Sequence, residues 1–111
     1  MAIDKSLISG STTMLLLRLL SERDMYGYEM IETLRERSRN VFELKAGTLY
    51  PLLHSLEEKK LLTVYEKEAG GKVRKYYSLT KEGHRALDEK KEEWMVYSEA
   101  ILNVLNMEGA L

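Results

Sequence analysis

Five side chains in one short stretch of the chain could contact a phosphate or the edge of a base. They are Lys45, Thr48, Tyr50, Pro51 and His54. The hydroxyls of Thr48 and Tyr50 can hydrogen-bond to either target, and Pro51 can contact a thymine methyl group. None of the five is an arginine placed to recognise guanine, so we expect only modest recognition of the DNA sequence by direct contacts to bases. The shape of the DNA, and the spacing of two binding sites if the protein is a dimer, should contribute more to specificity. Two plainer roles stay open, because Tyr50 can be partly core and Thr48 can act only as a helix cap.

A short helix within the stretch from Leu44 to Leu62 must position these residues. Pro51, the only proline, is tolerated near a helix start, which places that start at Ala46 to Thr48. The exposed front of this helix is then small and polar at its N-terminal end, where free N–H groups favour an anion such as a DNA phosphate. The buried face is marked by leucines at three- and four-residue steps, namely Leu49, Leu52, Leu53 and Leu56.

A basic hairpin is predicted directly after this helix. Residues 62–68 and 73–79 alternate as strands, and the glycine pair within 69–72 forms the turn. Cations on such a hairpin can reach phosphates or the minor groove beside a helix in the major groove. The alternative is an ordinary solvated hairpin, since exposed edge strands often carry lysine. Three tyrosines are interleaved with the cations, which are Lys67, Lys72, Arg74 and Lys75. The predicted DNA-contacting residues are Tyr28, Lys45, Thr48, Tyr50, Pro51, His54, Lys72, Arg74 and Lys75.

Two further helices are predicted before the Leu44 stretch. The first covers about 7–20 and the second about 27–38, with a polar connection at 21–25 between them. Residues 41–44 alternate like a brief strand. Two helices followed by a third across a tight connection give the order of a helix-turn-helix, and the hairpin would make it winged.

The C-terminal part reads as one long helix over 80–107. Leu87, Trp94 and Ile101 recur every seven residues, with Tyr97 and Val104 between them, although Lys90 interrupts the pattern. A long helix cannot bury such a stripe alone against a small head, so we expect a second copy of the chain to cover it. The predicted architecture is mainly α, with a winged helix-turn-helix head at 1–79 and a dimerisation helix at 80–111.

Composition excludes several classes of function. The chain has 111 residues and a net charge of −1, with +2 carried by residues 1–79 and −3 by 80–111, so bulk charge does not by itself argue for nucleic acid. There is no cysteine, and the two histidines lie thirty residues apart, so no enzyme, metal site or cofactor is expected. The N-terminal residues show no secretory pattern, and we expect a cytoplasmic protein.

Several motifs together give the chain a resemblance to a known family. They are Tyr26-Gly27-Tyr28-Glu29, Gly47-Thr48-Leu49-Tyr50-Pro51 with Leu53, Leu56-Glu57, and Arg74-Lys75-Tyr76-Tyr77-Ser78-Leu79-Thr80 followed by Glu82-Gly83. Over nearly its whole length the chain resembles the PadR family of bacterial transcriptional regulators, and its single C-terminal helix resembles the short subfamily. This resemblance implies a homodimeric repressor that binds a palindromic operator in double-stranded DNA and is released by a small effector.

A narrower likeness concerns Trp94, whose placement is similar to that in multidrug-sensing members, where paired tryptophans sandwich planar aromatic drugs. The likeness implies that Leu7, Ile8 and Met14 help to line the same pore. An aromatic residue at a heptad position can equally be plain dimer core. Two further alternatives stay open: a phenolic-acid effector, and a protein-interaction module that does not bind DNA. The predicted ligand and dimer interface comprises Leu7, Ile8, Met14, Leu87, Trp94, Tyr97, Ser98, Ile101 and Leu105.

Overall fold

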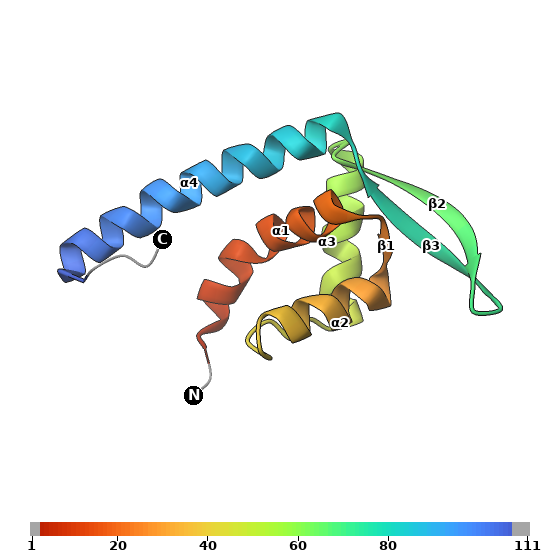
Figure 1. Cartoon of the computed structure of the whole chain (residues 1–111), viewed down its shortest axis with the longest axis horizontal. Helices are drawn as coiled ribbons and strands as arrows, with labels where there is room; N and C mark the ends of the chain where they lie inside the picture. Colours follow the sequence, from red (N-terminus) through yellow and green to blue (C-terminus); the bar gives the residue numbers. More distant parts are fainter. Residues whose placement is uncertain (1–2, 108–111) are drawn as a thin grey trace.

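Four helices and a small antiparallel sheet make up residues 3–107 of the protein (Figure 1). The structure is a computed structural model that describes residues 3–107. The elements in chain order are α1 (Lys5–Glu22), β1 (Met25–Tyr26), α2 (Gly27–Arg37), α3 (Ala46–Glu58), β2 (Leu62–Ala69), β3 (Lys72–Leu79) and α4 (Lys81–Leu105). The winged helix-turn-helix with a long C-terminal helix is therefore confirmed. No helix within the described range is long and apolar enough to cross a membrane.

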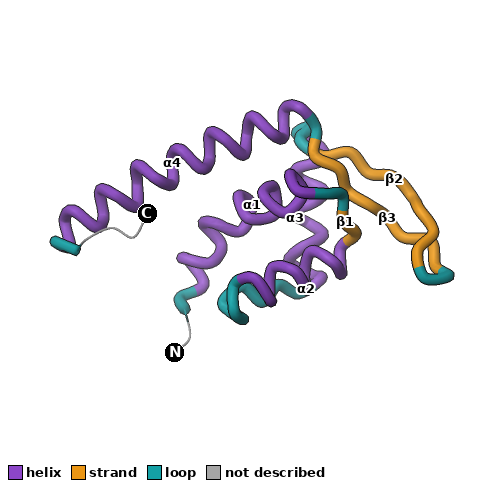
Figure 2. The backbone as a smooth tube through the Cα atoms, viewed as in Figure 1, coloured by secondary structure: helices purple, strands orange, loops and turns teal. Residues whose placement is uncertain are grey.

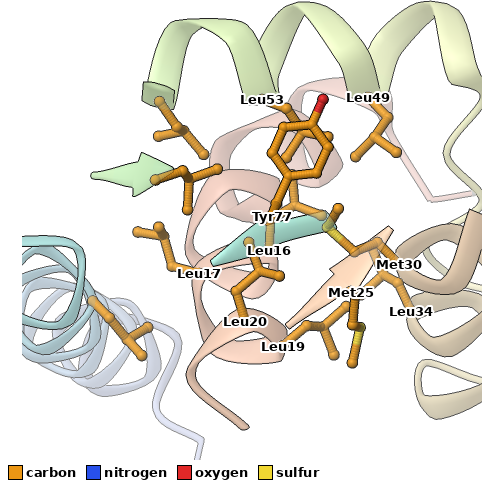
Figure 3. Close-up of a cluster of buried hydrophobic side chains, with 13 residues drawn as sticks. Leu16, Leu17, Leu19, Leu20, Met25, Met30, Leu34, Leu49, Leu53 and Tyr77 are labelled. Atoms are coloured by element: carbon orange, nitrogen blue, oxygen red, sulfur yellow. The ribbon is translucent and has the colours of Figure 1, made fainter. Parts of the chain in front are cut away.

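The hydrophobic core lies where α1, α2 and α3 meet the inner face of the sheet (Figure 3). The leucine stripe of α3 supplies Leu49, Leu53 and Leu56 to it, and Leu52 is half-buried at its margin. Burying one such side chain stabilises the fold by roughly 1.5–3 kcal/mol. The other core residues are Leu16, Leu17, Leu19, Leu20, Met25, Met30, Leu34, Leu62, Tyr77 and Leu87.

The sheet has the strand order β1-β3-β2 (Figure 2). The β2–β3 hairpin, here called the wing, pairs from Leu62 opposite Leu79 to Ala69 opposite Lys72. Gly70 and Gly71 form its turn at φ values of 60° and 81°, a conformation that glycine adopts without a steric penalty. The hairpin prediction is confirmed. The third strand of the sheet is β1, which pairs through Met25 opposite Tyr77.

Two local predictions were wrong. Residues 21–25 are not a polar connection, because α1 continues to Glu22 and Met25 is a fully buried residue of β1. Residues 41–44 form no strand and belong to the loop between α2 and α3, which Figure 2 shows beside α2. Arg39 and Asn40 follow the end of α2 with φ values of 53° and 68°, a left-handed conformation that turns the chain out of the helix.

Helix α3 begins at Ala46, within the predicted range, but Thr48 does not cap it. Lys45 is the N-cap residue, and no side chain caps the helix, so Thr48 lies inside the first turn. The N–H groups of Thr48 and Leu49 both donate to the Lys45 carbonyl oxygen, at 2.9 Å. Pro51 is the sixth residue of the helix and cannot donate to the carbonyl of Gly47. Because Gly47 is exposed, water can satisfy that carbonyl.

A single residue, Thr80, joins the wing to α4. Its hydroxyl oxygen caps α4 by accepting from the Gly83 N–H at 2.9 Å, and the hydroxyl lies 2.8 Å from the Lys60 carbonyl oxygen. Gly83 is buried, and a Cβ there would collide with the Leu61 carbonyl oxygen and the Leu79 side chain. From this junction α4 runs past α1 and extends beyond the head (Figure 1).

Candidate nucleic-acid interface and interhelical cavity

The N-terminal half of α3 presents an exposed polar surface. Lys45, Thr48, Pro51 and His54 are all exposed, as predicted for residues that would approach a double helix. Gly47 is exposed beside them, and a Cβ added to it would meet no atom within 4 Å. The absence of a side chain there leaves room for another molecule to come close to the backbone.

Tyr50 does not join this surface. It is half-buried, and its ring packs against Gly27, the first residue of α2, so closely that a Cβ on Gly27 would collide with the Tyr50 hydroxyl. The plainer role as partial core is the one that the structure supports. Tyr28, which follows Gly27 in the first turn of α2, is 64% exposed and is therefore accessible to another molecule.

The wing has two faces with different charge. The register pairs Lys67 with Arg74 and Ala69 with Lys72, which places these three cations on the outer face, away from the core. The inner face, which carries Tyr77 into the core, continues toward the tip with Lys75 opposite Glu66. The predicted DNA contacts of the wing are therefore divided between the two faces.

Tyrosine rings cover the outer face of the wing at its base. The ring of Tyr76 meets Tyr26 edge-on with centroids 5.4 Å apart, and it stacks on Tyr65 at 5.7 Å. Arg74 lies over the Tyr26 ring, 4.4 Å from its centroid, and Lys67 lies 5.3 Å from the Tyr76 centroid. These are distances at which a cation is attracted to a ring face.

A hydrogen bond links this tyrosine cluster to Asp24, the residue that precedes β1. The Tyr65 hydroxyl donates to Asp24 Oδ2 at 2.7 Å, and this bond raises the pKa of Tyr65. Sequence reasoning missed Asp24 because it fell in the supposed connection, and Tyr26 because it was placed in the motif that opens the second helix. A strand of two residues has no periodicity of its own, so no local signal could have found β1.

The distal part of α4 carries an exposed apolar stripe. Val104 is 86% exposed and Tyr97 66%, while Trp94, Ile101 and Leu105 are also accessible; Ser98 is half-buried beside them. The predicted stripe is thus unburied within one protomer, except at Leu87. That residue is 4% exposed and belongs to the core of the head.

A cavity of about 360 Å³ lies between α1 and α4. Met14 and Trp94 both line it, whereas Leu7 and Ile8, which the resemblance also assigned to a ligand pore, are not among its lining residues. Leu7 is exposed at the start of α1 and Ile8 is half-buried. The complete lining is Gly10, Thr13, Met14, Lys90, Glu93, Trp94 and Tyr97.

A second cavity, of about 390 Å³, adjoins the first behind α3. Thr13, Lys90 and Glu93 line both cavities, and Ser55 and Lys59 of α3 line the second. The two spaces therefore connect the region around Trp94 with the C-terminal half of α3. Neither cavity holds a group of three or more potential metal ligands, and no such group occurs among residues 3–107.

Comparison with known proteins decides the family. The model of the transcriptional regulator PadR-like family matches residues 16–89, from within α1 through the wing to the first turns of α4. This chain belongs to the PadR-like family. It is a DNA-binding transcriptional regulator and not an enzyme. The alternative of an interaction module that does not bind DNA is thereby set aside.

Individual relatives align with most of this chain. A protein from Lysinibacillus sphaericus is 38% identical over 96% of this chain and 97% of its own length. The transcriptional regulator YqjI of Escherichia coli is 32% identical over 83% of this chain, which spans only 43% of YqjI.

Solved structures extend the likeness to the fold. A transcriptional regulator from Clostridium thermocellum superimposes with a TM-score of 0.82 at 33% identity, covering 88% of this chain and 96% of the other. A PadR family regulator from Eggerthella lenta gives a TM-score of 0.82 at 35% identity, covering 93% and 88%.

Proposed function

We propose that this PadR-like regulator acts in the cytoplasm as a homodimeric repressor that binds a palindromic operator and is released by a small aromatic effector. The observation that carries the proposal is the apolar stripe on the distal half of α4, because its side chains are largely exposed in one protomer. A second copy of the chain would bury them. Two-fold pairing of the heads then matches a target whose two halves are inverted repeats.

In the proposed complex, the two α3 helices enter successive major grooves about 34 Å apart. Thr48, Pro51 and His54 face the bases and phosphates, and Lys45 and Tyr28 flank them. The cations Lys72 and Lys75 of the wing contact the flanking phosphates. With few base-reading side chains available, the spacing of the half-sites and the shape of the DNA supply much of the specificity.

Effector release follows from the position of the two cavities. A planar aromatic molecule would bind between Met14 and Trp94, which both line the first cavity and would offer it a thioether and an indole ring as polarisable contacts. Because Thr13, Lys90 and Glu93 also line the cavity behind α3, a ligand held there affects the angle between α4 and the head. The ligand changes the angle between the two heads of the dimer only if it binds one dimer geometry more tightly than the other.

Lys90 favours a second class of effector, an aromatic carboxylate such as a phenolic acid. It is half-buried on the wall that the two cavities share. The ion pairs found among residues 3–107 join Arg18, Arg23, Arg35 and Arg37 to glutamates, and none includes Lys90. A carboxylate on the ligand would give this ammonium group a partner.

The test is a gel shift with DNA from upstream of the encoding gene. The upstream DNA is first searched for an inverted repeat, and binding to that repeat is then measured at a series of salt concentrations. Operator binding predicts that the logarithm of affinity falls linearly with the logarithm of salt concentration, at about −0.9 per phosphate neutralised. Lys72→Ala and Lys75→Ala together should flatten this slope. A slope unchanged in the double variant would remove the wing from the proposed interface. Scrambling one half-site should abolish tight binding if the dimer reads both halves.

A further inference from the structure

Arg74 lies on the outer face of the wing, and its contacts there indicate a role other than the DNA contact expected from the sequence. We propose that Arg74 is a positioning residue, which fixes the wing relative to α2 by lying on the Tyr26 ring, and that it does not contact DNA. The proposal rests on DNA binding by the regulator. It names the side chains that hold the wing in place, as opposed to those that touch phosphate.

The first support is the different environment of the neighbouring cations. Arg74 is half-buried, whereas Lys72 and Lys75 on the same strand are exposed. Its guanidinium carbon lies 4.4 Å from the Tyr26 ring centroid. At that distance the planar guanidinium covers the ring, an arrangement that arginine forms more readily than lysine.

The second support is the position of Arg74 just beyond the point where the three-stranded sheet becomes a two-stranded ribbon. Strand β1 pairs with β3 only at Tyr76 and Tyr77, so from Lys75 outward β3 pairs with β2 alone. A two-stranded ribbon in water is marginally stable. Arg74 is the first outer-face residue beyond the end of β1, and it reaches back to Tyr26 of that strand.

The contact continues from Tyr26 to α3. The Tyr26 N–H donates to Glu29 Oε1 at 3.3 Å, and Glu29 pairs with Arg23 at 2.9 Å. Gly27, the next residue, packs against Tyr50 of α3. A wing held on Tyr26 is therefore held at a fixed position relative to the helix that enters the DNA.

Two matched variants distinguish a residue that holds the wing in place from a residue that neutralises a DNA phosphate. Arg74→Ala and Lys75→Ala each remove one positive charge from adjacent positions of β3. We expect Lys75→Ala to reduce the magnitude of the salt slope by about 0.9, the effect of one phosphate contact. Arg74→Ala should weaken binding about two- to fivefold at every salt concentration and leave the slope unchanged, as expected for loss of an exposed cation–π contact.

The partner ring supplies the second arm of the experiment. Tyr26→Leu should weaken binding as Arg74→Ala does, and the double variant should be no weaker than either single variant, because both remove the same contact. Tyr26→Phe keeps the ring and should retain full affinity. A reduced slope in Arg74→Ala, or additive losses in the double variant, would overturn the proposal.

Hydrogen exchange tests the same contact without DNA. The amides of residues 72–75 should exchange faster in Arg74→Ala and at the original rate in Lys75→Ala. Equal exchange in the two variants would show that Arg74 does not hold the wing, even if Tyr26→Leu proved too unstable to study. If the unaltered protein failed to bind its upstream DNA, the operator proposal would fall, while the exchange measurement would still decide the role of Arg74.

Discussion

The ring of Tyr50 in α3 packs directly against Gly27, the first residue of α2. This contact sets how closely the two helices of the helix-turn-helix approach each other, and it leaves no room for a Cβ on Gly27. We predict that Gly27→Ala lowers the free energy of unfolding by about 1–3 kcal/mol, the range for overpacking a filled site. Urea denaturation of the two proteins measures the difference.

A matched glycine controls for the change in helix propensity. A Cβ at Gly47 in the first turn of α3 would meet nothing within 4 Å, so Gly47→Ala should stabilise the fold by up to about 1 kcal/mol. Trimming Tyr50 to Leu in the Gly27→Ala background should recover part of the lost stability. Equal effects of alanine at the two glycines would contradict the packing argument.

Thr80 is expected to hold α4 at its present angle to the wing. Its hydroxyl caps α4 and lies within hydrogen-bond distance of the Lys60 and Leu61 carbonyl oxygens. Thr80→Ala should destabilise the protein by roughly 1–2 kcal/mol, as for loss of a helix cap. Thr80→Ser retains the hydroxyl and should lose far less. Thermal unfolding of both variants tests this, and equal losses would point to the methyl group instead.

Val104 offers the sharpest test of the proposed dimer. At 86% exposure it contributes little to the fold of one protomer, so Val104→Glu should leave that fold intact. If two α4 stripes pair, the substitution places like charges in their interface and should yield monomers in analytical ultracentrifugation. Asn103→Glu is the control, because Asn103 lies about 180° around the helix from Trp94 and therefore off the stripe, and this variant should remain dimeric. A stable monomer of the unaltered protein at micromolar concentration would refute the dimer itself.

Trp94 is the only tryptophan, so its fluorescence reports on the cavity without ambiguity. We predict quenching by planar aromatic compounds from a diverse panel. Gly10→Leu adds a side chain to the opposite wall of the cavity and should abolish the quenching, whereas Gly10→Ala should reduce it only slightly. Failure of every compound to quench the unaltered protein would remove the effector part of the proposal. Tighter binding of carboxylates than of their amides, lost in Lys90→Met, would identify the aromatic acids as the favoured class.

Alkaline pH should destabilise the protein through Tyr77. Burial raises the pKa of its hydroxyl above the ordinary value of about 10, and the nearby Tyr50 and Glu57 raise it further. The folded protein thus keeps this proton at a pH where the unfolded chain loses it. The associated stability is complete below about pH 10 and is lost as pH rises through the folded pKa. Tyr77→Phe should therefore lose less stability than the unaltered protein between about pH 9 and pH 11, measured by urea denaturation; parallel losses would exclude this contribution.

The sequence was most informative where spacing within one element carries the signal. The leucine steps of α3, the paired glycines of the wing and the stripe of α4 are all local patterns, and each element was predicted within a few residues. Strand β1 was missed because two residues carry no periodicity of their own. Met25 and Tyr26 form a strand only through pairing with Tyr77 and Tyr76, about fifty residues later in the chain.

The candidate site was predicted less well, because the sequence does not show which way a side chain turns. Tyr50 lies in the right helix but packs on Gly27. Arg74 and Lys75 are neighbours in sequence, yet they lie on opposite faces of the wing. Lys90 broke the heptad pattern, and the structure places it on a cavity wall. Each of these outcomes depends on contacts between elements that are distant in the chain.

Only Thr80 separates the last strand from the last helix. With no spare residue at this point, the base of the wing and the first turn of α4 are joined directly, so a change in the direction of α4 would act on the end of β3. If the proposed effector tilts α4, Thr80 would transmit that change to the wing, and the effector would not need to touch the DNA-reading surface in order to misalign it.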